Sequence, residues 1–243
     1  MASSYRFIGK TTQRKDAREI VTGSSKYIND LKFIDLLHGK ILRSPHPHAL
    51  IKKIDKKKAL ALPGVRAVLT WEDVPDWKGG TPRSTRILDR KVRYVGDAVA
   101  IVAADTEERA KEALRHIKVD YEVLAAVFDM EKALAPGAPQ LYEDFPGNIV
   151  TPGVPFFGPK NLKDVVMGDV EKGFAEADVV TEGTFGYENM PNPIPPEPPG
   201  AVALWEAPDK VTLWVSNQAS YMDTVILSHI MERKVQVRTI GGP

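Results

Sequence analysis

The sequence predicts an α+β fold, in which short strands and a few helices follow one another along the chain. Short runs of alternating apolar and polar residues recur throughout, which is the pattern of half-buried strands. One amphipathic helix pattern, at residues 106–117, stands between two such runs. Proline and glycine are dense at residues 128–167, which indicates a linker between two domains. The strand–helix–strand succession before this linker favours one α+β unit over residues 25–127.

Composition and charge exclude several classes of partner. The chain has 243 residues, of which 43% are hydrophobic and 27% charged, as in ordinary globular proteins. Its 33 basic and 32 acidic residues leave a formal net charge of +1, which argues against nucleic acid or an anionic membrane as the main partner. The N-terminus has no apolar signal region, and no stretch is long and apolar enough to span a bilayer. We therefore expect a cytoplasmic location.

Metal ligands of the usual kinds are scarce. The chain has no cysteine, so a disulfide, a cysteine metal site and a cysteine nucleophile are all impossible. His46 and His48 are interleaved with prolines, but at this spacing their rings point to opposite sides of an extended segment. We therefore expect a turn that orients polar side chains there, and no closed zinc site. A basic run at residues 52–58 is interpreted as a solvated face.

The first half of the chain is predicted to contain an N-terminal arm and then the α+β unit. The arm, residues 1–24, is expected to be extended, and Pro63-Gly64 is expected to stop a helix. Residue Asp105 or Thr106 is a suitable N-cap for the amphipathic helix. The predicted strands are residues 36–43, 49–55, 65–70, 92–104 with a break at Gly96, and 118–124, and the predicted helices are residues 56–62 and 106–117.

The second half, residues 168–243, is predicted to form another α+β domain. Asp169 is the expected N-cap of a short helix, and Ser220 that of a longer one. A hairpin is expected to turn at Pro208-Asp209-Lys210. The predicted helices are residues 168–178 and 220–232, and the predicted strands are residues 179–188, 201–206, 211–215 and 235–240.

The most distinctive stretch is the proline-rich segment at residues 193–199, which surrounds a single carboxylate, Glu197. Proline fixes φ and lacks a backbone donor, so this segment is expected to be a stiff, extended approach to the hairpin. The second hairpin strand ends on Ser216-Asn217-Gln218. Rigid loops and strand ends often carry functional side chains. A stiffened surface loop and an ordinary strand end explain the same residues, and the residues alone do not decide between the two interpretations.

The end of the chain carries a Gly241-Gly242 pair followed by Pro243. A glycine pair lets the backbone turn sharply or approach another group closely, yet no element follows it. The sequence therefore looks cut within a fold. No phosphate-binding loop, dinucleotide fingerprint, nucleophile elbow or zinc-protease motif is present. The residues by themselves indicate an α+β protein of two domains and give no reaction.

Several segments, taken in order, resemble the molybdopterin-binding large subunit of the xanthine dehydrogenase/aldehyde oxidase family. The first half is similar to the family's a/b hammerhead domain, and the second half to the start of its first molybdopterin-binding domain. The segments that carry the resemblance are Thr22-Gly23, Lys26-Tyr27-Ile28-Asn29-Asp30, Leu42-Arg43-Ser44-Pro45-His46-Pro47-His48-Ala49, residues 63–70, 92–100 and 119–124, Gly168-Asp169-Val170, Ala177-Asp178-Val179-Val180, residues 197–203, Ser216-Asn217-Gln218 and Ile240-Gly241-Gly242.

The resemblance implies roles for four residues. Gln218 stands where the family has a glutamine beside the molybdenum, and its amide is a suitable donor to a metal-oxo group. Gly241 and Gly242 match the start of a glycine-rich turn whose backbone amides reach the cofactor. Glu197 matches a glutamate that the resemblance implies to be a supporting carboxylate rather than the catalytic base. The chain departs from the family at residues 193–196, where relatives often have a histidine followed by Ala-Pro-Met.

The resemblance also implies an activity and partners. The complete enzyme would hydroxylate an aldehyde or an N-heterocycle with oxygen from water, using a molybdenum–molybdopterin cofactor. Electrons would pass to 2Fe-2S clusters and FAD on an iron–sulfur subunit and a FAD subunit. The missing remainder of the molybdopterin subunit would supply most pterin contacts and the base, so this chain is expected to be inactive alone. The alternative is a non-catalytic binding or assembly module left by a truncated or split large subunit.

Overall fold

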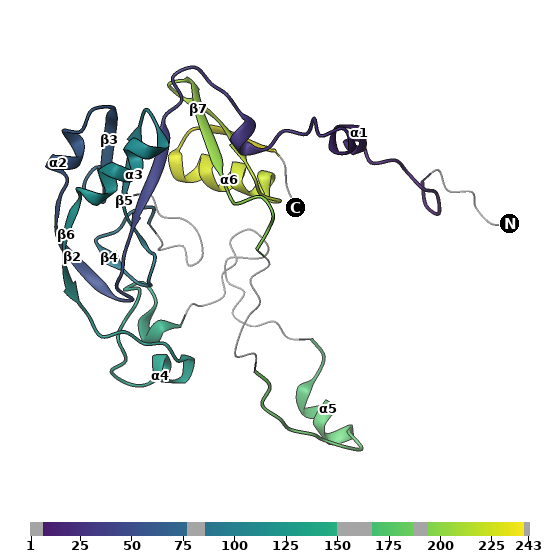
Figure 1. Cartoon of the computed structure of the whole chain (residues 1–243). Helices are drawn as coiled ribbons and strands as arrows, with labels where there is room; N and C mark the ends of the chain where they lie inside the picture. The colour runs from purple at the N-terminus through teal and green to yellow at the C-terminus, as the bar shows by residue number, and fades with distance from the viewer. Residues whose placement is uncertain (1–6, 77–85, 150–166, 187–193, 241–243) are drawn as a thin grey trace. The chain divides into compact units, whose positions relative to one another are not determined.

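The computed structural model describes residues 7–76, 86–149, 167–186 and 194–240 (Figure 1). The chain divides into two compact units. The first joins Met1–Leu36 to Pro193–Pro243, and the second spans Leu37–Asn192. The helices and strands are α1 (Ala17–Val21), η1 (Ile28–Asp30), β1 (His38–Arg43), β2 (Ala49–Asp55), α2 (Lys57–Leu60), β3 (Val65–Thr70), β4 (Lys91–Val92), β5 (Ala98–Ala104), α3 (Glu107–Arg115), β6 (Lys118–Val123), α4 (Met130–Leu134), η2 (Pro146–Asn148), α5 (Val170–Glu176), β7 (Ala201–Ala207), β8 (Lys210–Val215), α6 (Ser220–Met231) and β9 (Lys234–Thr239).

The second unit contains two three-stranded antiparallel sheets, ordered β1-β5-β3 and β4-β2-β6. The central strand β5 is almost wholly apolar, as expected for a strand buried on both faces. Helices α2 and α3 place Ala59, Ala110 and Ala113 in the same buried cluster as Val102 of β5. A second cluster gathers Ala49, Ile51, Val92 and Val99. Two buried clusters give this unit a core of its own.

Two local features place α3. Thr106 is the N-cap, because its side chain accepts a hydrogen bond from the Arg109 backbone N–H at 3.2 Å. Gly64 stands before β3 with a φ of +81°, which favours glycine. A Cβ at this position would lie only 2.4 Å from Arg109 Nη1. The turn between α2 and β3 therefore favours glycine for its φ, and a side chain at this position would also displace the Arg109 side chain.

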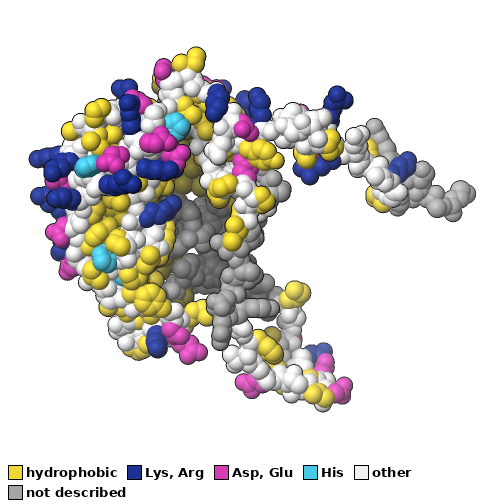
Figure 2. All heavy atoms as spheres, in the orientation of Figure 1, with side chains coloured by type: hydrophobic (Ala, Val, Ile, Leu, Met, Phe, Trp, Pro, Cys, Tyr) yellow, Lys and Arg dark blue, Asp and Glu magenta, His cyan; other side chains and the backbone are white. Residues whose placement is uncertain are grey.

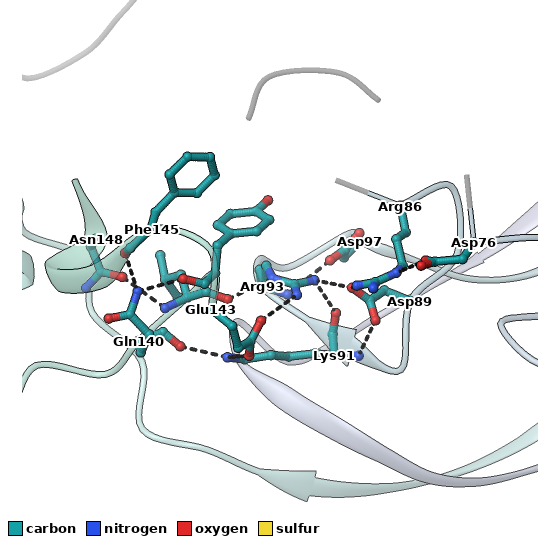
Figure 3. A network of polar contacts seen from close by, with 12 residues as sticks. Asp76, Arg86, Asp89, Lys91, Arg93, Asp97, Gln140, Glu143, Phe145 and Asn148 are labelled. Carbon is teal, nitrogen blue, oxygen red and sulfur yellow. Dashed lines mark hydrogen bonds and ion pairs between the residues drawn. The ribbon is translucent and has the colours of Figure 1, made fainter. Parts of the chain in front are cut away.

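A polar network ties residues 140–148 to the strand region before β5 (Figure 3). Arg93 is its centre: Nη1 donates to Asp89 at 2.7 Å, Nε donates to the Leu141 carbonyl at 2.9 Å, and the guanidinium lies 4.4 Å from the Tyr142 ring centroid. Lys91 Nζ donates to the Gln140 carbonyl at 2.7 Å and to Glu143 at 3.0 Å. The predicted linker thus folds back, as far as residue 148, onto the unit it follows.

Burial and charge act in opposition within this network. Burial by itself raises the pKa of Asp89. The hydrogen bond and the charge of Arg93 lower this pKa by more than burial raises it, so the pKa lies below its usual value. Burial raises the pKa of Asp97 above its usual value, although the Arg93 and Ala98 backbone N–H groups donate to its carboxylate. The network therefore holds the two segments together through both carboxylates.

The predicted basic face is solvated and interspersed with carboxylates. Lys52 pairs with Glu122, and Lys56 pairs with Asp73 while donating to the Val68 carbonyl at 3.2 Å. Figure 2 shows Lys and Arg gathered over the α2 end of the second unit, with Asp and Glu among them. Such mixed charge is ordinary surface, as the sequence indicated.

The first unit is built on a three-stranded sheet, β7-β8-β9, in which β7 and β8 are antiparallel and β8 and β9 are parallel. Val211 and Thr212 of the central strand and Val235 of β9 are buried. Helix α6 joins β8 to β9 and packs against β9. A strand–helix–strand crossover of this kind is what allows two successive strands to be parallel.

Most predicted elements are confirmed, and three predictions are wrong. Residues 179–186 form no strand, because among the described residues no neighbouring strand pairs with them, and Val179 is 78% exposed. The N-terminal arm is not extended throughout, since it contains α1. Ser220 lies inside α6, which Ala219 precedes without a side-chain cap. The predicted break at Gly96 is confirmed, because β4 and β5 are two strands with a turn at Gly96 between them.

In the part of the chain that the structure describes, no helix is long and apolar enough to cross a membrane.

Candidate functional site

Three segments singled out in the sequence meet at one end of the β7-β8-β9 sheet. Because β8 and β9 are parallel, Val215 lies opposite Thr239, and both strands finish at the same end. Strand β7 runs antiparallel to β8, so its first residue, Ala201, lies opposite Val215. The Ile240 backbone N–H donates to the Val215 carbonyl at 3.0 Å. The carboxyl ends of adjacent parallel strands are a recurrent place for cofactor sites in α/β proteins.

Ser216 joins the proline-rich segment to the end of β8. The Ser216 backbone N–H donates to the Gly200 carbonyl at 3.1 Å, and the Gly200 N–H donates to Ser216 Oγ at 2.8 Å. Ser216 Oγ also lies 3.4 Å from the Pro198 carbonyl. These contacts hold residues 198–200 against the strand end, so the predicted stiff approach is anchored at its C-terminal side.

Asn217 and Gln218 have different surroundings. The Asn217 side chain donates to Asp223 and accepts from the Ala219 backbone N–H at 3.3 Å, so it organises the start of α6. Gln218 is exposed and, within the described ranges, makes no side-chain hydrogen bond. An amide with two unengaged donors at the strand end is a group that a ligand could use.

Glu197 contacts the N-terminal segment. Its Oε1 accepts a hydrogen bond from the Ile28 backbone N–H at 3.1 Å, at the start of η1. The Ile28 side chain packs against Gly200, where a Cβ would lie 3.0 Å from Ile28 Cγ2. The Phe33 ring packs against Trp214 of β8, with ring centroids 5.0 Å apart and the ring planes tilted by 51°. Residues 28–33 therefore belong to the unit that carries the candidate site, a relation between distant segments that sequence reasoning missed.

A cavity of about 680 Å³ adjoins the same unit's sheet end. Thr239 and Ile240 line it on one side, and α1 with the turn before η1 on the other. Arg14 lies at its wall and is bound to Asp16 by two hydrogen bonds of 2.6 and 2.9 Å. Sequence reasoning missed these lining residues too, since nothing in an alternating-charge arm marks it as a cavity wall.

The predicted site residues are therefore partly brought together. Gln218 and the Glu197 segment flank the same strand end through Ser216, whereas Glu197 itself points to the N-terminal segment. Gly241 and Gly242 lie outside the described residues. Among the described residues, no cluster of three or more His, Asp or Glu could hold a metal ion.

The two histidines of the proline–histidine turn are placed separately. His48 is 3% exposed, and its Nδ1 lies 2.5 Å from the Ala125 carbonyl, while its Nε2 is buried with no partner within the described residues. His46 packs edge-on against Tyr121, with ring centroids 4.9 Å apart. The prediction that this segment is a turn is confirmed.

Two family models match the chain in succession. Residues 22–125 match the a/b hammerhead domain of aldehyde oxidase and xanthine dehydrogenase, and residues 155–242 match the molybdopterin cofactor-binding domain. The fold and the matched domains thus define a protein of the molybdopterin class.

Similar proteins agree with both models. A probable xanthine dehydrogenase subunit of Bacillus subtilis is 38% identical over 95% of this chain and 30% of its own length. A nicotinate dehydrogenase large molybdopterin subunit of Eubacterium barkeri is 32% identical over 100% of this chain and 56% of its own length. Among solved structures, quinoline 2-oxidoreductase from Pseudomonas putida 86 is 27% identical, with a TM-score of 0.75 over 96% of this chain and 30% of its own.

The chain belongs to the xanthine dehydrogenase/aldehyde oxidase family, as part of its molybdopterin-binding large subunit. The predicted α+β fold with a hammerhead domain is confirmed. The chain spans 30% of the length of the Bacillus relative and 56% of that of the Eubacterium relative.

Proposed function

We propose that this chain is the N-terminal part of a molybdenum hydroxylase large subunit and supplies one wall of its molybdenum–molybdopterin site. The complete enzyme is proposed to be a cytoplasmic, multi-subunit oxidoreductase that hydroxylates an aldehyde or an N-heterocycle. Iron–sulfur and FAD subunits are proposed to receive its electrons. Family membership supports the class of chemistry, and the meeting of three family-like segments at one sheet end supports the position of the site.

The observation that carries the proposal is the contrast between Gln218 and its neighbours. Ser216 and Asn217 are engaged in fixing the proline-rich segment and α6, whereas Gln218 is exposed with its amide unengaged within the described residues. This donor suits the oxo group of a molybdenum cofactor. When bound, the cofactor would supply the two-electron oxidation of the substrate. Gln218 would orient it by hydrogen bonding, and Glu197 would act indirectly by holding residues 28–33 in place.

The proposal is tested by metal analysis of the complex that this chain forms with the polypeptides encoded beside its gene. We expect stoichiometric molybdenum in that complex. Gln218→Leu should lower the molybdenum content, whereas the matched control Gln236→Leu, on an exposed position of β9, should leave it unchanged. A stable complex without molybdenum would contradict the proposal.

The second candidate is a non-catalytic binding or assembly module, and the separate core of the second unit favours it. Limited proteolysis distinguishes the two. If residues 37–148 survive while residues 194–240 are degraded even with partners present, the module is favoured. Protection through Gln218 in the presence of partners favours the enzyme part.

A further inference from the structure

The two edges of the β7-β8-β9 sheet differ in how their backbone groups are satisfied. Helix α6 covers the β9 edge. Ser228 Oγ accepts from the Val235 backbone N–H at 3.2 Å, and Thr224 Oγ1 accepts from the Val237 N–H at 3.2 Å. These N–H groups point away from β8 and are paired with side chains, so another strand cannot bind them. Among the described residues, β7 is therefore the edge of the sheet whose outward backbone groups are left without such side-chain partners.

The outward-facing groups of β7 follow from its pairing. Gly200 and Ser216 form a hydrogen-bonded pair, and in an antiparallel ladder such pairs recur at every second residue. Val202 and Leu204 therefore bond inward to β8, where they lie opposite Trp214 and Thr212. Residues 201, 203 and 205 direct their N–H and C=O groups outward. Among the described residues, β7 has no second neighbouring strand.

The side chains of β7 are mostly apolar although most of them are exposed, which is typical of a strand that lies beside another strand. Ala201 and Ala203 are exposed, Leu204 is 40% exposed and Trp205 is 54% exposed. Open edge strands are usually protected by proline, lysine or inward-pointing charge. The only charged residue of β7, Glu206, is bound by Lys210 and by Thr212 Oγ1 at 2.7 Å. Nothing within β7 itself opposes the addition of another strand.

We propose that β7 accepts an additional β-strand from the part of the large subunit that lies outside this chain. The inference rests on the proposed function, because it assumes that the remaining subunit assembles with this chain. We assign the added strand to the rest of the large subunit because relatives extend well beyond the matched region. This chain spans only 30% of the length of the Bacillus relative. The incoming strand would present aliphatic or aromatic side chains beside Leu204 and Trp205 and would bond to the backbone of residues 201, 203 and 205.

Hydrogen exchange tests the inference directly. The amides of Ala201, Ala203 and Trp205 should exchange rapidly in the chain alone and at least about tenfold more slowly in the complex with the polypeptides encoded beside its gene. The Val202 and Leu204 amides, bonded to β8, should already be protected in the chain alone. Equal exchange of residues 201, 203 and 205 in both samples would overturn the inference. Protection that depends on the concentration of the chain alone would identify a second copy as the occupant and would also overturn it.

A pair of proline variants gives an independent test. Ala203→Pro removes an outward N–H, which a strand edge tolerates, whereas Val202→Pro removes an N–H bonded to β8. We expect Ala203→Pro to retain the thermal unfolding of the wild type but to weaken complex formation at least about tenfold. Ala203→Gly keeps the N–H and should assemble normally. Val202→Pro should unfold the unit itself. Normal assembly of a folded Ala203→Pro variant would contradict the inference.

The outcomes separate this inference from the proposed function. A molybdenum-containing complex with unprotected β7 amides contradicts the strand addition only. A complex with protected β7 amides and no molybdenum supports the strand addition and contradicts the proposed function.

Discussion

The hydrogen bond from Ile28 to Glu197 makes a prediction about the N-terminal segment. Glu197 Oε1 is 3.1 Å from the Ile28 nitrogen, at a half-buried position. A hydrogen bond to a charged group contributes about 1.5–3 kcal/mol. In Glu197→Ala, the free energy that opposes local opening of residues 27–31 should fall by about this amount. Since 1.4 kcal/mol corresponds to about tenfold, exchange of the Ile28 amide should rise by about 10- to 150-fold.

Hydrogen exchange followed by mass spectrometry or NMR measures this effect. Glu197→Gln keeps a carbonyl oxygen and should lose about 1 kcal/mol or less, because a neutral acceptor replaces a charged one. Glu131→Ala, which removes an exposed carboxylate from α4, is the control for charge. Tryptic cleavage after Lys26 and Lys32 should accelerate in Glu197→Ala. If Ile28 exchanges at the wild-type rate in Glu197→Ala, the assignment of Glu197 as the anchor of this segment is wrong.

Three further predictions concern the folded units. Gly64→Ala should lower the free energy of unfolding, measured with urea, by about 1–2 kcal/mol or more. Adding Arg109→Ala to this variant should relieve the contact between the new Cβ and the Arg109 side chain but leave the cost of the positive φ. Ile51→Ala should cost about 2–5 kcal/mol because Ile51 is fully buried, whereas Ile34→Ala, at a 94% exposed position, should stay within about 0.5 kcal/mol. Because the folded-state pKa of Asp89 is lowered, the ionised Asp89 stabilises the fold above its unfolded-state pKa, and this stabilisation is lost as pH falls through the folded-state pKa. Asp89→Asn should therefore flatten the decline in the free energy of unfolding at acid pH. An unchanged decline would contradict the pairing of Asp89 with Arg93.

Local patterns predicted the fold well where each element is determined by its own residues. The alternation at residues 49–55 and 65–70 matches β2 and β3. Asp169 and Thr106 cap helices as their side chains indicated. The strand expected at residues 179–188 was wrong over its described part, because alternation supplies the pattern of a strand but not the neighbouring strand it needs.

The candidate site was predictable only in part, because it depends on contacts between distant segments. Ser216-Asn217-Gln218 stands out as a polar strand end, but only the parallel pairing of β8 and β9 brings Ile240 beside it. The association of Ile28 and Phe33 with this unit spans most of the chain. No periodicity or spacing can report such a contact, so the role of Glu197 as an anchor became visible only in the folded structure.

The central claim is that Gln218 faces the molybdenum cofactor in the assembled enzyme. The electron paramagnetic resonance spectrum of Mo(V), recorded on the partly reduced complex, tests it most directly. Gln218→Leu should change the g-values or couplings of that signal, because the proposed hydrogen-bond donor to the oxo group is removed. Gln236→Leu should give the wild-type spectrum. A Gln218→Leu complex with full molybdenum content and an unaltered Mo(V) signal would contradict the account.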